Sequence, residues 1–583
     1  MSSKPKSAKS EAPANDAGAP AGDQAQDQAK RTVESALGQN VMGDFLPSDL
    51  YGTAGELWLR AAKQPMALTK AAFGFWGDVA KIMIGQGDKR EPEKGDRRFS
   101  DKAYEDNPLY SRLLQTYLAW RSSLHGFAET AQLSDKERFL LDQMIEAGAP
   151  SNSLLGNPAA MRAAVETKGG SLVKGAKNLA GDIRKRRPIP SQVDEKAFKV
   201  GENLAVSPGS VVLRTEMFEL IQYRAQTETV HERPVLIVPS IVNKFYIFDI
   251  APGRSIIEYY IQNGHTVFML AWRNPQKRHD RWGMSDYQDS IDAAIDATTS
   301  ITGSKDVNLW AVCGAGPVAV SMAGYYAAKK TRKINSLLLV VSPLDTKAMA
   351  QAPSLSPFAE PENETARNVM RKVSRNKRIS ANEFTLLFAM LRPNDLIWNY
   401  WVSNYLMGQT PSAFDVLYWN GDGTGMTAQF NHDFSEFVDE NPFASDGAMK
   451  VRDTAIAPLS QLDIDSYVLG AATDHLCVWQ SVWRSSELLG ERSQFVLGNS
   501  GHIQTIVCPP TNQKASFFTN AAKGASAEQW LETATKHPGS WWNHGVAWTA
   551  ERAGERVAAP KAEGNAEFPP LCAAPGTYVH ERG

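Results

Sequence analysis

The stretch NLWAVCGAGPVAVSM, residues 308–322, carries the strongest signal for the fold. An apolar run of the strand type leads directly into Cys313, which is followed by Gly314, Ala315 and Gly316. A reactive side chain on a sharp strand-to-helix turn needs small neighbours, because the backbone there is crowded. The pattern therefore predicts a buried strand, a nucleophile at the turn and a helix. The alternative is that Cys313 is a small core residue, since free cysteine is among the most buried residue types.

Two later segments favour the catalytic interpretation of Cys313. Asp474 follows an apolar strand pattern at 466–469, and His502 follows another at 494–497. Enzymes of the α/β-hydrolase fold present a nucleophile, an acid and a histidine in this chain order. A thiol with an ordinary pKa of about 8.5 needs a base to become a thiolate at neutral pH. We predict that His502 is this base, and that Asp474 orients it or helps to deprotonate a hydroxyl nucleophile.

The arrangement of apolar patterns predicts an α/β-hydrolase fold with a cap. Short apolar strands alternate with helices, which is typical of a mostly parallel sheet covered on both faces. A long aromatic-rich insertion interrupts them, and a cap there would keep water from an acyl intermediate. The expected organisation is a disordered tail (1–30), a helical N-terminal domain (31–198), the first part of the core (199–343), the cap insertion (344–462), the second part of the core (463–560) and a C-terminal tail (561–583).

Composition, charge and cysteine count limit the partners and cofactors that we expect for this chain. The 583 residues are 43% hydrophobic and 22% charged, with a formal net charge of −2, which is typical of a soluble globular protein. A nucleic-acid-binding protein would carry a basic face, so we expect no nucleic-acid partner. Four cysteines predict no disulfide framework, and no signal peptide is evident, so a cytoplasmic location is expected. No nucleotide-binding motif or metal-ligand cluster is apparent, so we expect no cofactor and no metal.

Two further cysteines lie close in sequence to the predicted triad. Cys477 is three residues after Asp474, and Cys508 is six residues after His502. A metal or redox pair would account for these positions, but neither spacing matches a zinc site. Small buried hydrophobic residues are the favoured interpretation for both.

From about Asp96 onward, the chain resembles the polyhydroxyalkanoate synthases, and it is closest to the class II, medium-chain type. The resemblance is spread over many segments, which makes it more specific than a single motif. These segments are DRRFSDKAYEDNPLYSRLLQTYLAWR, PSQVDEKAFKVGENLAVSPGSVV, PSIVNKFYIFDIAP, HTVFMLAWRNP, ITGSKDVNLWAVCGAG, LRPNDLIWNYWVSNYLMG, FDVLYWNGDGT, SGHIQT and PGTYVHER.

The resemblance implies an acyltransferase that polymerises (R)-3-hydroxyacyl-CoA to a polyester and releases coenzyme A. Cys313 would then hold the acyl or growing chain as a thioester, His502 would be the general base, and Asp474 would help to activate the 3-hydroxyl of the incoming unit. The backbone amides of Gly314 and Val242 would form the oxyanion hole. Residues expected close to the substrate, for which a structural role is an equal alternative, are Tyr246, Asp249, Trp419 and His475.

The chain departs from the family pattern at four places. Ala311 and Ala315 stand where the family's turn has glycine, and their Cβ atoms are expected to crowd it. Val478 replaces the proline of the DHxxPW motif, and Asn431 replaces a histidine that follows the WN-D-T stretch. These departures leave open two alternatives: a cysteine-dependent thioesterase or polyester hydrolase, and a weakly active paralogue that binds granules or pairs with an active synthase.

The expected partners follow from the same resemblance. They are the hydroxyacyl-CoA substrate, with coenzyme A present only as part of it, the surface of a cytoplasmic polyester granule, and a second synthase chain, most simply in a homodimer. Apolar residues at helical spacing between residues 49 and 85 predict one or two amphipathic helices, broken at Pro65 and Gly74. No apolar run reaches the roughly 18 residues needed to span a membrane. These helices pack on the following helical region or lie on the granule.

Overall fold

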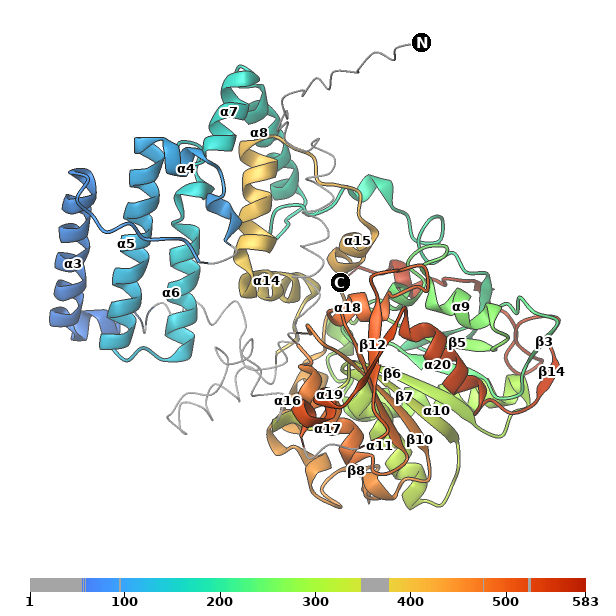
Figure 1. The fold of residues 1–583 in the computed structure, drawn as a ribbon. Helices are drawn as coiled ribbons and strands as arrows, with labels where there is room; N and C mark the ends of the chain where they lie inside the picture. Colours follow the sequence, from blue (N-terminus) through green and yellow to red (C-terminus); the bar gives the residue numbers. More distant parts are fainter. Residues whose placement is uncertain are drawn as a thin grey trace, which may run out of the picture.

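The computed structural model describes residues 59–93, 96–347, 377–474, 476–522 and 526–582, together with Gly55 and Leu57. A helical region that includes residues 65–184 lies beside an α/β region (Figure 1). The tail predicted to be disordered at residues 1–30 lies outside the described residues. Within those ranges, no helix has both the length and the apolar character needed to cross a membrane.

The α/β region is built on one large sheet. Its strands are β1 Gly209–Arg214, β2 Phe218–Tyr223, β4 Val235–Val238, β5 Val267–Trp272, β6 Val307–Val312, β7 Ile334–Val340, β10 Asp465–Ala471, β11 Ser493–Gly498, β12 Ser516–Thr519, β13 Thr535–Pro538 and β15 Cys572–Ala573. Their order is β13-β12-β11-β10-β7-β6-β4-β5-β2-β1-β15. Pairing is parallel from β11 to β5 and antiparallel towards both edges. The mostly parallel sheet predicted from the sequence is confirmed. Two short ribbons pair β3 Thr229–His231 with β14 Arg556–Ala558, and β8 Lys450–Val451 with β9 Thr454–Ala455.

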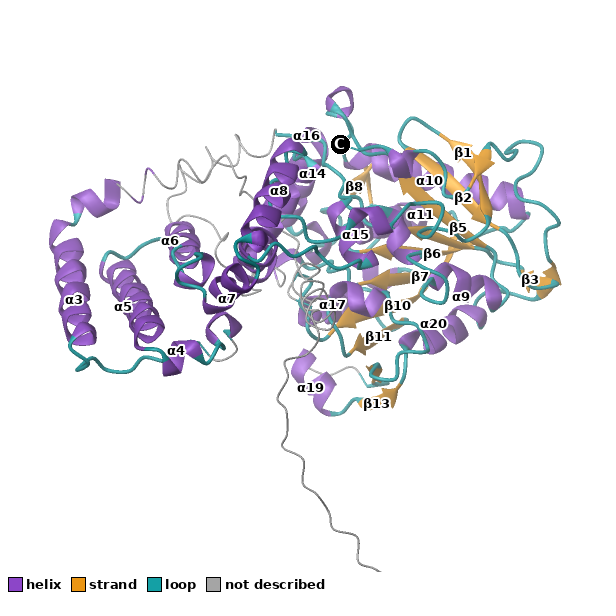
Figure 2. Cartoon of the chain, turned by 90° about the horizontal axis from the view of Figure 1, so that it is seen from above, coloured by secondary structure: helices purple, strands orange, loops and turns teal. Residues whose placement is uncertain are grey.

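Helices cover both faces of this sheet, with α9 (Ile256–Gln262) and α20 (Trp541–Ala550) on one face and α10 (Met284–Thr302) and α11 (Ala315–Ala328) on the other (Figure 2). Because both faces are covered, the central strands β4 and β6 are buried at every position. Helix α11 is apolar on all sides, as expected for a helix enclosed between the sheet and α10. The remaining helices of this region are α17 Trp479–Leu488, α18 His502–Ile506 and α19 Ala527–Glu532.

The sequence WWNHGVAWTAERAGE, residues 541–555, suggests a surface helix, but the structure buries most of its helical part. Trp541 and Trp542 of α20 are buried. Their indole nitrogens donate hydrogen bonds to the carbonyl oxygens of Thr505 (2.7 Å) and Ile506 (3.1 Å). The charged residues that suggested a surface lie mostly beyond Ala550, where the helix ends. Helix α20 therefore supports α18, the helix that His502 begins.

The N-terminal region is helical, as predicted. Its helices are α3 Pro65–Met83, α4 Ala103–Asp106, α5 Pro108–Thr130, α6 Asp135–Ala147, α7 Pro158–Glu166 and α8 Gly170–Arg184. Pro65 begins α3, where its missing N–H costs no hydrogen bond, and the helix continues through Gly74, so neither residue breaks it. Helix α3 packs on α5, and Ser123 Oγ donates to the carbonyl oxygen of Ala71 at 2.7 Å. Large apolar side chains on α3 nevertheless stay exposed, among them Phe73 (76%) and Trp76 (66%).

The insertion expected to be a cap also packs against the N-terminal helices. Its described elements are α14 Ala381–Leu391, the π-helical turns η7 Asn394–Trp398 and η8 Trp401–Leu406, α15 Asp415–Gly421 and α16 Ala428–Glu440. Tyr405 of η8 donates a hydrogen bond to Asp182 of α8 (2.8 Å), and the indole of Trp401 donates to the carbonyl oxygen of Asn152 (3.2 Å). The aromatic residues of η8 thus join the two regions.

The packing of α8 on η8 predicts a strong effect of Gly175→Ala. A Cβ atom at residue 175 would lie 1.9 Å from the carbonyl oxygen of Tyr405, so the two backbones would have to separate. We expect a loss of about 2–4 kcal/mol in unfolding free energy, measured by urea titration of the helical signal. Gly181→Ala is the matched control, because residue 181 lies on the same helix with no atom within 4 Å of an added Cβ. Equal stability of the two variants would contradict the prediction.

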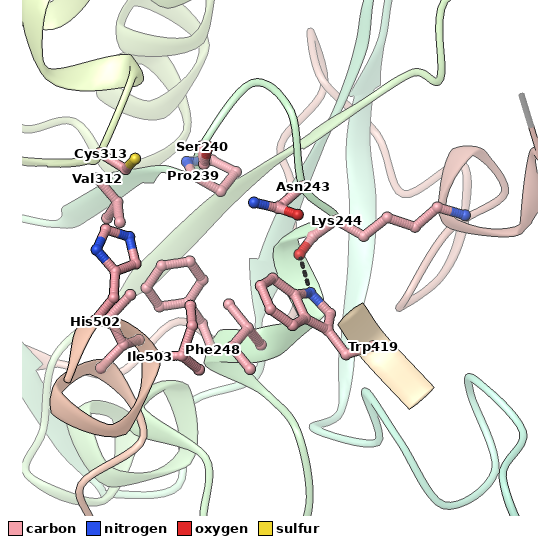
Figure 3. Close-up of a pocket in the computed structure, with 12 residues that line it drawn as sticks. Pro239, Ser240, Asn243, Lys244, Phe248, Val312, Cys313, Trp419, His502 and Ile503 are labelled. Atoms are coloured by element: carbon pink, nitrogen blue, oxygen red, sulfur yellow. Dashed lines mark hydrogen bonds between the residues drawn. The ribbon is translucent and has the colours of Figure 1, made fainter. Parts of the chain in front are cut away.

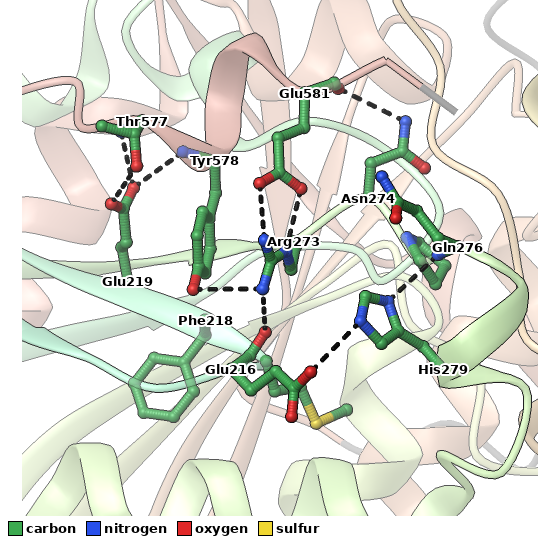
Figure 4. A network of polar contacts seen from close by, with 12 residues as sticks. Glu216, Phe218, Glu219, Arg273, Asn274, Gln276, His279, Thr577, Tyr578 and Glu581 are labelled. Carbon is green, nitrogen blue, oxygen red and sulfur yellow. Dashed lines mark hydrogen bonds and ion pairs between the residues drawn. The ribbon is translucent and has the colours of Figure 1, made fainter.

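Residues 572–582, expected to belong to a tail, are bound to the sheet. Strand β15 pairs with β1, and the buried carboxylate of Glu219 accepts hydrogen bonds from the amides of Thr577 (2.8 Å) and Tyr578 (3.0 Å) (Figure 4). Arg273 makes two hydrogen bonds of 2.9 Å to the carboxylate of Glu581 and lies over the ring of Tyr578. This segment is therefore an integral part of the core.

The same segment reaches the loop that follows β4. The buried ammonium group of Lys244 donates to the carbonyl oxygens of Val579 and Glu581 and forms an ion pair with Asp422 at 3.1 Å. Lys244 belongs to the loop of residues 239–244, which also contains Val242. The 572–582 segment consequently supports the loop predicted to supply an oxyanion-hole amide.

Candidate active site

Cys313 occupies the turn between β6 and α11 with the predicted strand–turn–helix geometry. Its φ is +53°, in the left-handed region that residues other than glycine rarely adopt. Two hydrogen bonds hold this strained backbone: the Cys313 amide donates to the carbonyl oxygen of Val340 (2.9 Å), and Ser342 Oγ donates to the carbonyl oxygen of Cys313 (2.7 Å). Strain maintained in this way is common where a side chain must be presented for chemistry.

The alanines at the turn do not prevent this geometry. Ala311 and Ala315 are fully buried, and their methyl groups belong to the hydrophobic core. The position without space is Gly316, where a Cβ atom would lie 1.7 Å from Ser342 Oγ. The glycine that the turn requires is therefore present, and the crowding expected at residues 311 and 315 does not distort it.

The structure brings Cys313, Asp474 and His502 together. His502 Nδ1 lies 2.6 Å from Asp474 Oδ2, and His502 and Cys313 line the same cavity. Asp474 Oδ1 accepts hydrogen bonds from the amides of Leu476 (2.9 Å) and Cys477 (3.1 Å). Both carboxylate oxygens are thus used, and this fixes the orientation of the imidazole.

The electrostatics of the site favour a thiolate and an imidazolium. Burial acts to lower the pKa of His502, but the negative charges of Asp474 and Cys313 outweigh burial and raise that pKa. The thiol of Cys477 acts to lower the pKa of Cys313, and His502 acts in the same direction, while burial opposes both. These shifts favour the proton on His502 and the negative charge on Cys313.

A small cavity adjoins Cys313 and His502 (Figure 3). Its volume is about 20 Å³, which is enough for a water molecule but not for an acyl group. Its lining residues are Pro239, Ser240, Asn243, Lys244, Ile247, Phe248, Val312, Cys313, Trp419, His502, Ile503 and Ile506. The cavity is therefore too small for an acyl chain in this structure.

Two loops at this cavity carry the amides predicted for an oxyanion hole. Gly314 is the N-cap residue of α11, and its N–H belongs to the first turn, where amides have no partner within the helix. Val242 lies in the loop of residues 239–244, between Ser240 and Asn243, which both line the cavity. The two predicted donors are thus close in sequence to residues that line one cavity, while neither is itself a lining residue.

Comparisons with known proteins identify the family. The family model described as Poly-beta-hydroxybutyrate polymerase (PhaC) N-terminus matches residues 95–260, and the alpha/beta hydrolase fold model matches residues 233–507. Poly(3-hydroxyalkanoate) polymerase 1 of Ectopseudomonas oleovorans is 42% identical over 557 residues, which cover 95% of this chain and 98% of that protein. This chain belongs to the poly(3-hydroxyalkanoate) polymerase family. The poly(3-hydroxyalkanoate) polymerase subunit PhaC of Cupriavidus necator is 35% identical over 497 residues, 83% of each chain. The resemblance seen in the sequence is confirmed.

Of the four further residues predicted near the substrate in this polymerase family member, the three that the structure describes lie in different surroundings. Trp419 lines the cavity, and its indole nitrogen donates to the carbonyl oxygen of Lys244 at 2.7 Å (Figure 3). Tyr246 donates to Asp422 (3.0 Å) and is not among the lining residues. His475 lies outside the described residues.

Asp249, the remaining one of the four, supports a loop. Its carboxylate accepts hydrogen bonds from the amide (3.0 Å) and the hydroxyl (2.6 Å) of Ser207, and it does not line the cavity. Two of the departures from the polymerase pattern lie at defined positions in the fold. Val478 is the N-cap residue of α17, and the side-chain amide Nδ2 of Asn431 donates to the carbonyl oxygen of Lys377 at 3.1 Å.

Sequence reasoning missed that Cys477 lies close to Asp474 and His502 in this polymerase site. The prediction that it is buried is correct, but its sulfur lies within 4.8 Å of both a ring nitrogen of His502 and a carboxylate oxygen of Asp474. It also missed the apolar wall formed by Phe248, Ile503 and Ile506. The available signal was spacing, because residues 502 and 506 lie one helical turn apart on α18.

Proposed function

We propose that this chain is an acyltransferase that polymerises (R)-3-hydroxyacyl-CoA into polyhydroxyalkanoate and releases coenzyme A. The observation that carries the proposal is the buried Cys313–His502–Asp474 constellation in a chain of the poly(3-hydroxyalkanoate) polymerase family. Family membership supports the substrate class, and the geometry supports covalent catalysis through a thiolate.

The first step loads the enzyme. The Cys313 thiolate attacks the thioester carbonyl carbon of hydroxyacyl-CoA, and the amides of Gly314 and Val242 donate hydrogen bonds to the oxyanion that forms. The intermediate collapses with cleavage of the bond between carbon and the coenzyme A sulfur. The proton on His502 passes to the departing thiolate, which leaves as coenzyme A. An acyl thioester on Cys313 and a neutral imidazole remain.

The second step lengthens the chain. The neutral imidazole of His502 accepts the proton of the 3-hydroxyl of an incoming hydroxyacyl-CoA, whose oxygen attacks the thioester on Cys313. An ester bond forms, and Cys313 leaves as a thiolate beside the imidazolium of His502. Because both oxygens of Asp474 already accept hydrogen bonds, we assign it the orientation of His502 rather than direct contact with the hydroxyl.

The surroundings of the site favour polymerisation over hydrolysis. Phe248, Trp419, Ile503 and Ile506 form an apolar wall beside the thiolate, and such a wall limits the access of water to an acyl thioester. Coenzyme A enters as part of the substrate, and the proposed steps use no other cofactor or metal. The side chains named here supply every proton transfer in the cycle.

The decisive experiment identifies the product. Purified protein is incubated with medium- and short-chain (R)-3-hydroxyacyl-CoA, coenzyme A release is followed, and the product is extracted and sized. Insoluble polyester supports the proposal. Free 3-hydroxy acid as the only product would instead show a thioesterase, and no release from any substrate would favour a non-catalytic partner of another synthase.

We also propose that the protein acts at the surface of cytoplasmic polyester granules and pairs there with a second synthase chain. The exposed apolar side chains of α3, including Met66 (85%), Phe73 and Trp76, support contact with an apolar polymer surface. Pairing with a second chain is supported by the family resemblance alone.

The granule contact predicts an effect of replacing Phe73 and Trp76 together by serine. We expect the bound fraction to fall severalfold when the protein is sedimented with purified polyester granules, because each substitution removes a large exposed apolar surface. Leu155→Ser is the control, since Leu155 is equally exposed (73%) but lies outside α3. Undiminished sedimentation of the double variant would exclude α3 as the contact.

A further inference from the structure

The ammonium group of Lys244 is buried beside the active site and has one oxygen partner for each of its N–H donors. It donates to the carbonyl oxygens of Val579 and Glu581, and Asp422 Oδ1 lies 3.1 Å from it. An ammonium group has three N–H donors, so these three acceptors use its full capacity. Lysine is seldom buried unless it is paired in this way. The polymerisation steps described above do not use this group.

The side chain of Lys244 does not reach the reacting atoms. Lys244 is one of the residues that line the cavity, but its side chain extends away from Cys313 and His502 (Figure 3). Any effect of the ammonium group on the reaction must therefore pass through the loop of residues 239–244, which carries the Val242 amide.

The cap holds the same loop at two backbone positions. The indole nitrogen of Trp419, on α15, donates to the carbonyl oxygen of Lys244 at 2.7 Å. The amide of Thr424 donates to the carbonyl oxygen of Val242 at 3.4 Å. Asp422, which pairs with the ammonium group, lies between these two cap residues in the chain. The position of the Val242 peptide unit is thus linked to the position of the cap.

The C-terminal segment holds the ammonium group through contacts that the cap does not share. Glu581 supplies one of the carbonyl oxygens, and its carboxylate accepts two hydrogen bonds of 2.9 Å from Arg273 (Figure 4). Arg273 directly follows β5, which ends at Trp272. Lys244 is therefore the place where the oxyanion loop, the cap and a segment anchored at the end of a central strand meet.

We propose that Lys244 is a positioning residue whose ammonium group ties the cap and the C-terminal segment to the 239–244 loop and so holds the Val242 amide in place for the oxyanion. The role in catalysis rests on the acyl transfer proposed above, whereas the fixing of the loop does not depend on it. An oxyanion donor is effective because it is preorganised, and the loss of one such donor lowers kcat by about 10²- to 10³-fold.

The first test follows the loop itself, without substrate. Hydrogen–deuterium exchange is measured by mass spectrometry on the full chain, and a peptide that covers residues 239–244 is compared with one that covers α11. Lys244→Met keeps a long side chain but removes its charge and its donors. In this variant we expect the loop peptide to exchange about tenfold faster and the α11 peptide to exchange as in the wild type.

A second variant keeps the test valid if Lys244→Met fails to fold. Arg273→Met removes the two hydrogen bonds to the carboxylate of Glu581 but leaves Lys244 and its loop intact. We expect the loop peptide to exchange about threefold faster in this variant, because the C-terminal segment is held less firmly. If Lys244→Met does not fold, unchanged loop exchange in Arg273→Met would overturn the proposal.

The matched control is Lys333→Met. The ammonium group of Lys333 is paired with two aspartates of α10, at 2.7 and 2.6 Å, and Lys333 does not line the cavity. Exchange of the loop should be unchanged in this variant. Unchanged loop exchange in folded Lys244→Met, or an equal increase in Lys333→Met, would contradict the assignment of Lys244.

Activity supplies a readout that a merely structural role would not separate. Coenzyme A release passes through an oxyanion, whereas alkylation of Cys313 by iodoacetamide displaces iodide from a saturated carbon and forms none. In Lys244→Met we expect kcat for coenzyme A release to fall about 10²-fold, while the rate of alkylation, read on the peptide that contains Cys313, stays within about twofold of the wild type. Equal losses in the two reactions would show a general collapse of the site and overturn the positioning role.

The two measurements also separate this proposal from the proposed function. Coenzyme A release is common to a polymerase and a thioesterase, so the comparison with alkylation holds whichever product is formed. If the wild type releases no coenzyme A from any substrate, the proposed function fails, and hydrogen–deuterium exchange still decides whether Lys244 fixes the loop.

Discussion

Cys313→Ala is expected to reduce coenzyme A release from (R)-3-hydroxyacyl-CoA by at least about 10⁴-fold, because no other residue that lines the described cavity carries a thiol. The substitution removes one sulfur atom from a side chain that is 5% exposed, so the fold should be retained. Release is measured with a thiol-reactive dye, and the extracted polymer is weighed. Both should fall to the background of the uncatalysed reaction.

The control for this experiment is Cys572→Ala. Cys572 lies on the edge strand β15 and accepts a hydrogen bond from Arg214 (3.2 Å) rather than from any residue of the triad. Its removal should leave release within about twofold of the wild type, as is usual for substitutions away from a site. Substantial release by Cys313→Ala would show that Cys313 is a core residue, the alternative that the sequence left open.

Asp474→Asn is expected to lower kcat by about 10³- to 10⁴-fold, as in other triads that lose the carboxylate. The carboxylate orients His502 through the 2.6 Å contact at Nδ1 and raises the pKa of the imidazole. With an amide in its place, the pKa of His502 falls towards its ordinary value. His502 is then neutral over more of the pH range, and the imidazolium that stabilises the thiolate is lost as the pH rises through this lower pKa. The measurement is kcat against pH.

Asp249→Asn is the control for this experiment. It separates the loss of the group that orients His502 from the loss of any buried carboxylate. Asp249 is also a buried carboxylate, but its partner is Ser207. Burial raises the pKa of Asp249, although the hydrogen bonds from Ser207 oppose this. We expect this variant to lower the melting temperature with kcat changed by less than about tenfold. Equal losses of kcat in the two variants would show that Asp474 acts only through the fold.

The parts of the fold that the sequence predicted are those determined by local pattern. The strand, turn and helix around Cys313 follow from an apolar run next to small residues. The apolar run and the small residues lie within about fifteen positions of each other. The chain order of Cys313, Asp474 and His502 follows from the connectivity of a parallel sheet, whose strand ends meet at one edge. The mostly parallel sheet was predictable for the same reason.

The features that the sequence did not predict depend on contacts between distant segments. Helix α20 has tryptophans that could lie on a surface or in a core, and only its contact with Thr505 and Ile506 decides this. The sulfur of Cys477 comes within 4.8 Å of a ring nitrogen of His502, which follows another strand, and spacing in the sequence does not encode this contact. Strand β15 has no apolar alternation, and it is held by backbone pairing with β1 and by the bonds of Glu219 to residues more than 350 positions away.

The support of the 239–244 loop by the 572–582 segment also sets an order of events during protein synthesis. Lys244 donates hydrogen bonds to the carbonyl oxygens of Val579 and Glu581, which follow it in the chain by 335 and 337 positions. Domains fold as their residues emerge from the ribosome, N-terminal parts first. A nascent chain therefore carries Cys313 and its helix well before the loop with the Val242 amide gains its last anchor. We therefore expect acyl transfer to begin only after residues 579–581 have been made and bound to Lys244.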